Sequence, residues 1–278
     1  MRRFPTTALT TGALLAAALP VTVPRAWADD APPPAVRTVT QEPGHPTILY
    51  PGREGTAAAY CPQGTAATGG GATVQDDPAS AVYLRDSAPV GNGWQVRAYN
   101  STNEVQTLHP RVICTTDTTV THQAGPDVTV QQGEGSEYST ASCGSQYTVG
   151  GGGQAGPMTY LNMLIVPTSP MARQWLARAK YTNYDPDAPL SYVRALVSCS
   201  DTQPSYAYSH ILKVAPGAVG TVHAECPAGQ VPTGGGASGA PAVLFNESSP
   251  TPTGWTVRAT NTDYIEHTLD AMVMCTAP

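Results

Sequence analysis

The stretch from Cys61 to Cys114 decides the fold, because its landmarks occur twice more in the chain. These landmarks are, in order, Cys61-Pro62-Gln63-Gly64, Gly69-Gly70-Gly71, Pro89, Trp94-Gln95-Val96-Arg97-Ala98 and Cys114. The second copy has Cys143, Gly151-Gly152-Gly153, Pro170, Trp175 and Cys199, and the third has Cys226, Gly234-Gly235-Gly236, Pro250, Trp255 and Cys275. In this alignment each glycine triplet begins eight residues after its first cysteine, and each proline precedes its tryptophan by five residues. Spacing repeated in this way indicates a duplicated structural unit.

The duplicated unit extends ahead of its first cysteine, where the three copies also correspond. We therefore predict repeat 1 over residues 36–116, repeat 2 over 117–201 and repeat 3 over 202–278. Repeat 2 departs most from the pattern, since Gly144 replaces the proline after its first cysteine and Gln174 replaces the glycine before its tryptophan. Because of these departures, the sequence does not predict the conformation of the turns in repeat 2.

Hydrophobic residues within a repeat alternate with a period of two, as Trp94, Val96 and Ala98 do. Such alternation is typical of half-buried β-strands. The segment 170–180 also fits a helix, but its alignment with this strand in the other repeats favours a strand. We predict an all-β protein of three tandem antiparallel modules, each a small sandwich or barrel of six or seven short strands. Packing around a pseudo-threefold axis and a beads-on-a-string arrangement are both open.

Two cysteines in each repeat predict one disulfide per module. Six cysteines allow fifteen pairings, but the repetition singles out one set: Cys61–Cys114, Cys143–Cys199 and Cys226–Cys275. Modules of this size bury little surface and often need such a covalent link. Zinc sites usually bring cysteines together in closely spaced pairs, and this sequence has none, so disulfides are favoured over a metal site.

The first 28 residues have the features of a secretory signal peptide. Arg2 and Arg3 precede an apolar run, and Ala26-Trp27-Ala28 predicts cleavage after Ala28. Residues 29–35 are then a linker. The apolar run is too short to span a bilayer, so we expect a secreted, extracellular protein with no membrane span. Export to an oxidising compartment fits the predicted disulfides.

The charge balance argues against a nucleic-acid partner. The formal net charge is -6, whereas phosphate recognition needs clustered lysine and arginine. Beyond the expected signal peptide the chain has only two lysines, Lys180 and Lys213. Ligands of other kinds and the oligomeric state are left open by the composition.

The arginine three residues after each tryptophan is the candidate ligand-binding residue: Arg97, Arg178 and Arg258. Alternation places it on the sheet face opposite the tryptophan, where a guanidinium can clamp a carboxylate, a phosphate or an acidic sugar. A structural salt bridge, or an arginine stem that covers the outer sheet face, explains the repetition equally well and is the favoured interpretation.

Motifs for catalysis or cofactor binding are weak. The glycine triplets lack the following helix and lysine of a phosphate loop, so we expect them to form bulges or to pass close to the tryptophan. The six histidines occupy non-equivalent positions: His45, His109, His122, His210, His223 and His267. The acidic pair Asp185 and Asp187 has no counterpart in repeats 1 and 3 and is expected in a solvated loop. No cofactor, metal or catalytic residue is predicted.

The string Cys-Pro-x-Gly, Gly-Gly-Gly, Gly-Trp-x-Val and a closing Cys resembles repeats in uncharacterised secreted proteins of high-GC Gram-positive bacteria. It is also similar to repeats in some phage tail-fibre-like proteins. The resemblance covers most of each cysteine-to-cysteine interval, and Gly144 and Gln174 depart from it. It implies an extracellular β module and brings no catalytic residues with it.

These observations together predict a secreted, non-enzymatic binding protein that acts at the cell envelope or on extracellular ligands, glycans among them. Tyrosines expected outside the core suit sugar stacking: Tyr50, Tyr60, Tyr99, Tyr160, Tyr181, Tyr184, Tyr192, Tyr206 and Tyr208. A weak site presented three times would gain avidity. Two alternatives are a hydrolase or toxin component with a site at a module junction, and a structural subunit of an extracellular assembly.

Overall fold

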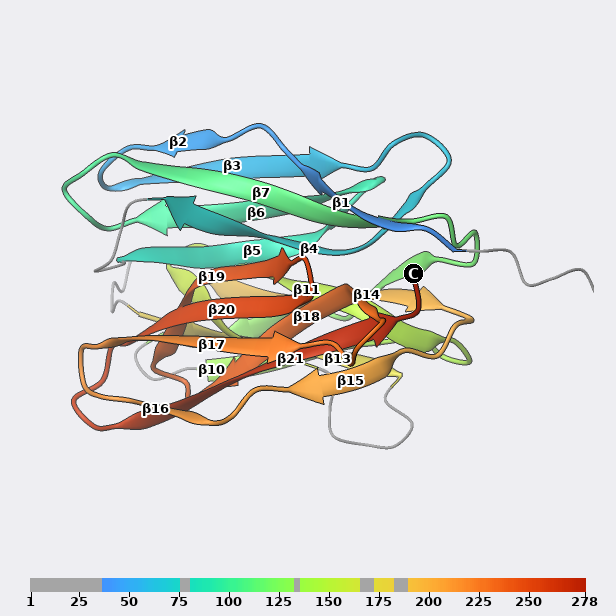
Figure 1. The fold of residues 1–278 in the computed structure, drawn as a ribbon. Coiled ribbons are helices and arrows are strands. Elements are labelled where there is room, and N and C mark those ends of the chain that lie inside the picture. The colour runs from blue at the N-terminus through green and yellow to red at the C-terminus, as the bar shows by residue number, and fades with distance from the viewer. Residues whose placement is uncertain (1–36, 76–80, 133–135, 166–172, 183–189) are drawn as a thin grey trace, which may run out of the picture. The chain divides into compact units, whose positions relative to one another are not determined.

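The computed structural model describes residues 37–75, 81–132, 136–165, 173–182 and 190–278 (Figure 1). All regular secondary structure in these ranges is β-strand, with seven strands in each repeat. The predicted all-β class of three tandem modules is therefore confirmed. The expected signal peptide and linker, together with Tyr184, Asp185 and Asp187, lie outside the described residues.

The strands of the three repeats correspond one to one. Repeat 1 has β1 (Val39–Pro43), β2 (Thr47–Leu49), β3 (Arg53–Tyr60), β4 (Ala66–Gln75), β5 (Val82–Val90), β6 (Gly93–Asn100) and β7 (Gln106–Thr115). Repeat 2 has β8 (Thr121–Ala124), β9 (Val128–Val130), β10 (Ser136–Ser142), β11 (Tyr147–Ala155), β12 (Thr159–Ile165), β13 (Gln174–Tyr181) and β14 (Ser191–Ser200). Repeat 3 has β15 (Ser205–Tyr208), β16 (Leu212–Val214), β17 (Val219–Glu225), β18 (Val231–Gly239), β19 (Val243–Thr251), β20 (Gly254–Asn261) and β21 (His267–Thr276).

Each of the three seven-stranded sheets is shared by two repeats. The sheet of repeats 1 and 3 has the order β1-β7-β4-β19-β20-β17, with β2 also on β7. The sheet of repeats 1 and 2 runs β3-β6-β5-β11-β14-β8, with β9 on β14, and that of repeats 2 and 3 runs β10-β13-β12-β18-β21-β15, with β16 on β21. A repeat is thus a sandwich of two half-sheets, and each half-sheet continues into a neighbouring repeat.

This sharing closes the three repeats into a ring. Repeat 1 joins repeat 2 where β5 pairs with β11, repeat 2 joins repeat 3 where β12 pairs with β18, and repeat 3 joins repeat 1 where β19 pairs with β4. We call these three junctions the seams. Because equivalent strands form every seam, the repeats are related by a pseudo-threefold axis, one of the two arrangements that the sequence left open.

Glycines allow the backbones to meet at this axis. A Cβ atom on Gly69 would lie 2.7 Å from the Cα atom of Gly234, and one on Gly234 would lie 2.5 Å from the Cα atom of Gly150. A Cβ atom on Gly150 would clash with the Thr68 carbonyl, next to Gly69. The next glycine of each run faces the indole of its own repeat, and the third faces a backbone carbonyl of the strand across the seam. A β-bulge immediately precedes each run, at Thr68, Val149 and Thr233. The expected bulge and close approach to tryptophan are confirmed, and the contacts at the axis and across the seams are additional.

Repeat 2 uses a different set of glycines from the one that the spacing indicated. Gly150, Gly151 and Gly152 occupy the three positions, rather than 151–153. The cause is the turn after the first cysteine, which in repeat 2 is closed by a hydrogen bond from Gln146 N–H to the Cys143 carbonyl, one residue earlier than in the other repeats. Gly144, with φ +60°, makes this earlier turn possible without the proline.

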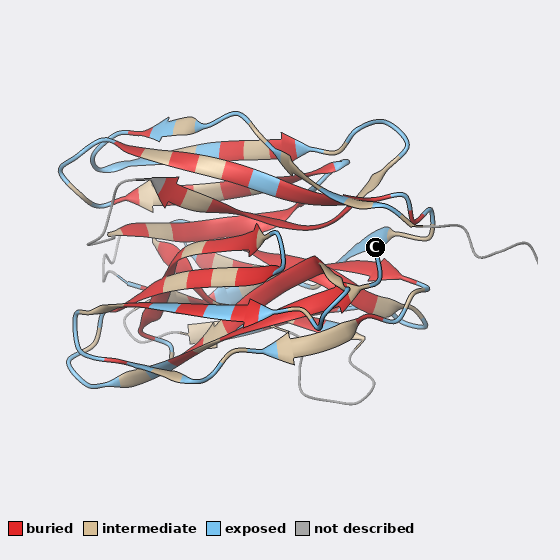
Figure 2. Ribbon diagram, viewed as in Figure 1, coloured by how far each residue is buried: buried red, intermediate tan, exposed pale blue. Residues whose placement is uncertain are grey.

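The core lies between the two half-sheets of each repeat (Figure 2), around one fully buried tryptophan. The indole N–H donates to the Ser87 hydroxyl from Trp94 and to the Ser248 hydroxyl from Trp255. All three predicted disulfides are present: Cys61–Cys114, Cys143–Cys199 and Cys226–Cys275. Each disulfide joins a residue that follows a strand of one sheet to a strand of the other, so it links the two layers of its repeat.

Candidate functional site

The Arg97 side chain ties repeat 1 to repeat 2 at their seam. Its Nε and Nη2 atoms donate to the two carboxylate oxygens of Asp86 at 2.9 and 3.0 Å, and Nη2 also donates to the Ala155 carbonyl at 2.6 Å. The Asp86 carboxylate in turn accepts the Ala155 N–H at 3.1 Å. Asp86 and Arg97 therefore hydrogen-bond the N–H and the carbonyl of Ala155, the last residue of β11, as the backbone of an adjacent strand would.

The other two arginines have equivalent positions at the other seams. Arg178 donates from Nε to the Asn162 amide oxygen at 2.7 Å and from Nη2 to the Gly239 carbonyl. Arg258 pairs with Glu247 at 3.0 Å, and Glu247 accepts the Val74 N–H at 2.7 Å across the seam.

For Arg97 and Arg258 these contacts are the structural salt bridges that the sequence offered as the alternative to ligand binding. Arg178 makes structural hydrogen bonds to neutral groups instead. The three guanidinium groups serve three separate seams, and they do not line the larger of the two pockets found at the axis. A role of Arg97, Arg178 and Arg258 in ligand binding stays a prediction. The candidate ligand site of the described residues lies instead at the pseudo-threefold axis.

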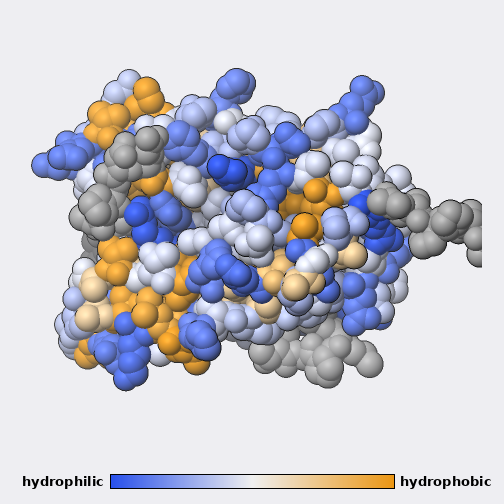
Figure 3. Space-filling model, in the orientation of Figure 1, coloured by the Kyte–Doolittle hydropathy of each residue, from blue (hydrophilic) through white to orange (hydrophobic). Residues whose placement is uncertain are grey.

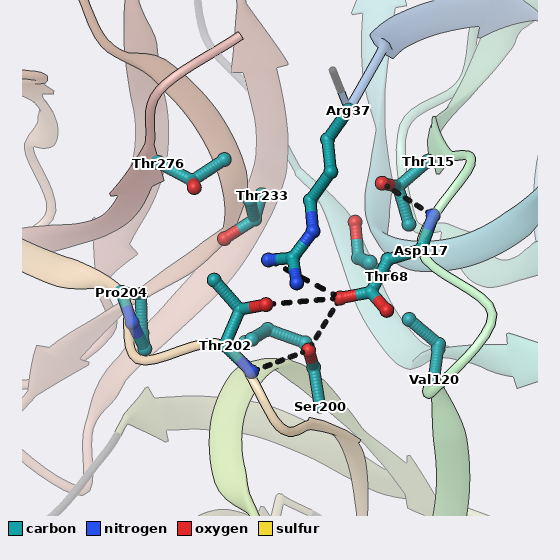
Figure 4. Close-up of a pocket in the computed structure, with 11 residues that line it drawn as sticks. Arg37, Thr68, Thr115, Asp117, Val120, Ser200, Thr202, Pro204, Thr233 and Thr276 are labelled. Carbon is teal, nitrogen blue, oxygen red and sulfur yellow. Dashed lines mark hydrogen bonds and ion pairs between the residues drawn. The ribbon is translucent and has the colours of Figure 1, made fainter. Parts of the chain in front are cut away.

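One end of the axis holds a small cavity lined by hydroxyl groups (Figure 4). Equivalent residues of the repeats surround it, namely those before the axial glycines and those after the closing cysteines: Thr68, Val149 and Thr233, and Thr115, Ser200 and Thr276. Its volume of about 20 Å³ has room for about one water molecule. Arg37 and Asp117 close it.

Asp117 is fully engaged with protein groups in this cavity. Its carboxylate accepts hydrogen bonds from Ser200 at 2.6 Å and from the Thr119 hydroxyl at 2.7 Å, and Arg37 lies 3.6 Å away. Burial alone would raise the pKa of Asp117, but the hydrogen bonds from Ser200 and Thr119 and the charge of Arg37 outweigh it, so the pKa is lowered. The cavity is too small for a ligand larger than about one water molecule, and its carboxylate is already hydrogen-bonded by protein groups.

The opposite end of the axis holds a hollow of about 440 Å³, which we call the tyrosine pocket. All three repeats line it: Tyr83, Tyr99, Ser101, Tyr160, Lys180, Thr182, Leu244 and Thr262. Tyr83, Tyr160 and Leu244 are equivalent residues of β5, β12 and β19, and Ser101, Thr182 and Thr262 each follow a strand that carries the repeat's tryptophan. The pocket is therefore a composite of the repeats and lies within the size range of small-molecule sites.

The wall at the seam of repeats 1 and 2 is a cluster of three aromatic rings. The Tyr160 ring centroid lies 5.5 Å from that of Tyr83 and 6.2 Å from that of Tyr99. The guanidinium carbon of Arg85 lies 5.5 Å from the Tyr99 ring and 4.9 Å from the Tyr160 ring. Arg85 also donates to the Tyr160 hydroxyl at 3.3 Å and pairs with Glu54. This buried cation therefore holds the Tyr99 and Tyr160 rings in place.

This wall breaks the threefold symmetry. The residues equivalent to Arg85 are Asn162 and Asn246, whose amides donate across the other two seams to the carbonyls of Pro241 and Val82, both at 2.8 Å. The seam of repeats 1 and 2 instead has a longer cationic side chain between tyrosines. The aromatic surface of the pocket is accordingly concentrated on one side.

Lys180 provides the cationic group of the tyrosine pocket. Nearby Asp263 has a lowered pKa, chiefly because it accepts hydrogen bonds from His267 and from the Tyr264 N–H, with a smaller contribution from the Lys180 charge. The Asp263 carboxylate is held by His267 at 2.8 Å. Lys180 is half-buried on the pocket wall, and its ammonium group has three hydrogens to donate.

The described histidines form small local contacts. His122 Nδ1 lies 3.2 Å from the Ser198 hydroxyl, and burial lowers the pKa of His122. Ser198 has no exposed surface, whereas His122 lies on β8, whose four residues are all exposed. Within the described ranges no group of three or more His, Cys, Asp or Glu side chains is arranged to hold a metal ion.

Two tyrosines expected outside the core are buried. Tyr181 is 1% exposed, and Tyr160 is 5% exposed as the floor of the tyrosine pocket. Tyr181 shares the buried face of β13 with Trp175, Ala177 and Ala179, so it belongs to the core of its own sandwich. Tyr160 is turned away from its sandwich and is covered at the seam with repeat 1. Tyr50, Tyr60 and Tyr208 are exposed, as expected.

The sequence singled out Tyr99 and Tyr160 but not the rest of the tyrosine pocket. Tyr83, Lys180 and Leu244 were missed as site residues, although their positions in the aligned repeats are equivalent or adjacent. The alignment contained part of the signal, because equivalent residues close to the axis of a ring line one shared hollow. Only the arrangement around the axis was missing.

Comparison with known proteins adds no assignment. No family model matches the chain, and no curated protein matches it significantly. The described part of the chain contains no helix long and apolar enough to cross a membrane.

Proposed function

We propose that this is a secreted, non-enzymatic binding protein that engages an extracellular or cell-envelope ligand through the tyrosine pocket. The observation that carries the proposal is the convergence of residues from all three repeats on one hollow of about 440 Å³ with an aromatic wall. Pockets with aromatic walls and a few polar groups are the usual form of ligand sites. Secretion rests on the signal-peptide pattern and is compatible with the three disulfides.

The surroundings of the pocket favour contact with a larger surface. In each repeat an exposed apolar residue lies shortly before the strand that follows Ser101, Thr182 or Thr262. These residues are Val105, Leu190 and Ile265, which are 56%, 77% and 51% exposed. Figure 3 shows further apolar side chains at the end of the molecule where β2 and β16 lie. Exposed apolar residues repeated in this way are typical of interaction surfaces.

A cell-envelope pull-down tests the proposal. The purified mature protein, a Tyr83→Ala/Tyr99→Ala variant and a Tyr60→Ala control would be incubated with envelope and extracellular-matrix fractions. Tyr60 is a suitable control because it is 62% exposed and lies at the far end of β3. We expect the pocket variant to lose capture and the control to keep it. Equal capture of all three proteins, or no capture by any fraction, would refute the proposal.

A further inference from the structure

We propose that the ligand of the tyrosine pocket is a small saccharide, stacked on Tyr99 and Tyr83 and hydrogen-bonded by Lys180 and the hydroxyl groups at the rim. This inference rests on the proposed function and adds the chemical class of the ligand.

The aromatic wall suits the C–H face of a sugar ring. Tyr83 and Tyr99 are half-exposed, while Tyr160 beneath them is almost fully buried. The two outer rings are tilted against Tyr160 by 58° and 47°, so they form a shaped wall rather than a flat stack. An aromatic ring with a polar edge offers a hydrophobic face and a hydroxyl to the same ligand.

The rim supplies the hydrogen-bonding groups that sugar hydroxyls require. Ser101, Thr182 and Thr262 place one hydroxyl from each repeat around the hollow. Each of these hydroxyls donates to a backbone carbonyl and keeps its oxygen as an acceptor, while Lys180 adds an ammonium donor. An apolar ligand of the same size would cover the Lys180 ammonium group and the acceptor sites of these oxygens without pairing them, at a cost that is largest for the charged group. A saccharide can pair them, because each of its hydroxyls both donates and accepts, like the hydroxyl groups of serine and threonine.

The wall is also prearranged for binding. The Arg85 side chain is 4% exposed and holds Tyr160 by a hydrogen bond and Tyr99 by its position over the ring. Rings that are fixed before the ligand arrives lose little conformational freedom on binding. The asymmetry between Arg85 and the asparagines at the other seams gives the ligand one preferred orientation against this wall.

The test is a glycan array followed by titration of the best saccharide against variants of the full mature chain. Tyr99→Ala should weaken binding roughly 10-fold or more through loss of stacking, whereas Tyr99→Phe keeps the ring and should stay within about threefold of wild type. Lys180→Met should weaken binding roughly 10-fold. The matched control is Lys213→Met, because Lys213 is 74% exposed and pairs with Glu266 outside the pocket.

Tyr99→Ala removes a ring that packs on Arg85, so its thermal unfolding must be measured as well. If that variant does not fold, Lys180→Met and Tyr99→Phe still decide the question. The inference is overturned if no glycan on the array binds, if Lys180→Met and Lys213→Met bind alike, or if a nucleoside or an apolar compound displaces the saccharide. A pull-down that still depends on Tyr83 and Tyr99 while no glycan binds would retain the proposed function and reject the saccharide.

Discussion

Replacing Arg97 by Met should destabilise the protein far more than an equivalent change at an exposed ion pair. In the folded protein Arg97 makes two hydrogen bonds to Asp86 and one to the Ala155 carbonyl. The Arg97 and Asp86 side chains are only 24% and 8% exposed. The substitution leaves a largely buried carboxylate and a buried carbonyl without this partner, which are the conditions under which loss of an ion pair is costly.

The magnitude follows from these exposures. Breaking a buried pair costs about 3–5 kcal/mol, and the partial exposure of Arg97 reduces this to about 2–4 kcal/mol of unfolding free energy. For a domain of this size that corresponds to a fall of roughly 5–15 °C in Tm. Arg194 provides the control, because it makes the same two-point contact with Asp127 at 2.6 Å but the side chains are 39% and 47% exposed. Arg194→Met should cost about 0–1 kcal/mol.

Urea unfolding with the disulfides intact, followed by near-ultraviolet circular dichroism of the buried indoles, measures both variants. A cycle with Asp86→Asn and the double variant then isolates the pair energy. The reasoning is refuted if Arg97→Met and Arg194→Met have the same unfolding free energy. A stable Arg97→Met protein that has lost ligand binding would instead restore the ligand role of this arginine.

Three further predictions concern the axis and the disulfides. Gly70→Ala places a Cβ against the indole of its own repeat and should lower the unfolding free energy by about 3 kcal/mol or prevent folding. Gly91→Asn, in an open turn at φ +53°, should change the unfolding free energy by less than about 1 kcal/mol. Comparable effects of the two substitutions in urea unfolding would contradict the close packing at Gly70. Cys61→Ser/Cys114→Ser should lower the unfolding free energy by about 2–5 kcal/mol, and intact mass should show that the other four cysteines remain oxidised; free thiols among them would show that the pairing is wrong. The pKa of Asp117 is lowered from its usual value of 3.8, so its ionised form stabilises the fold at neutral pH, and this contribution is lost as the pH falls through the folded-state pKa. Asp117→Asn should therefore be less stable than wild type at pH 7 and approach it in acid, and a difference that grows in acid would reverse the assignment.

The fold was largely predictable because its determinants are local. Alternation in 94–98 predicts a strand, and each cysteine pair is repeated at nearly constant spacing. The seams were not predictable from these patterns, because nothing in a period of two says whether a sheet ends at the repeat or continues into the next one. The glycine runs contained part of the answer, since three consecutive residues without a Cβ exceed what one bulge beside a tryptophan needs.

The site could be predicted only in part, for the same reason. The repeated arginines are conspicuous in a chain with few basic residues, yet Arg97 is used at a seam. Tyr83, Lys180 and Leu244 look ordinary in their separate strands and acquire a shared environment only when the ring closes. The expectation of three separate weak sites accordingly gives way to a proposal of one composite site.

The stoichiometry of binding tests this account most directly. Native mass spectrometry of the mature protein with the saccharide selected on the array should show one ligand per chain, because the tyrosine pocket is built once from all three repeats. That single adduct should disappear in Lys180→Met and persist in Lys213→Met. Three ligands per chain, or one that survives Lys180→Met, would contradict the composite axial site.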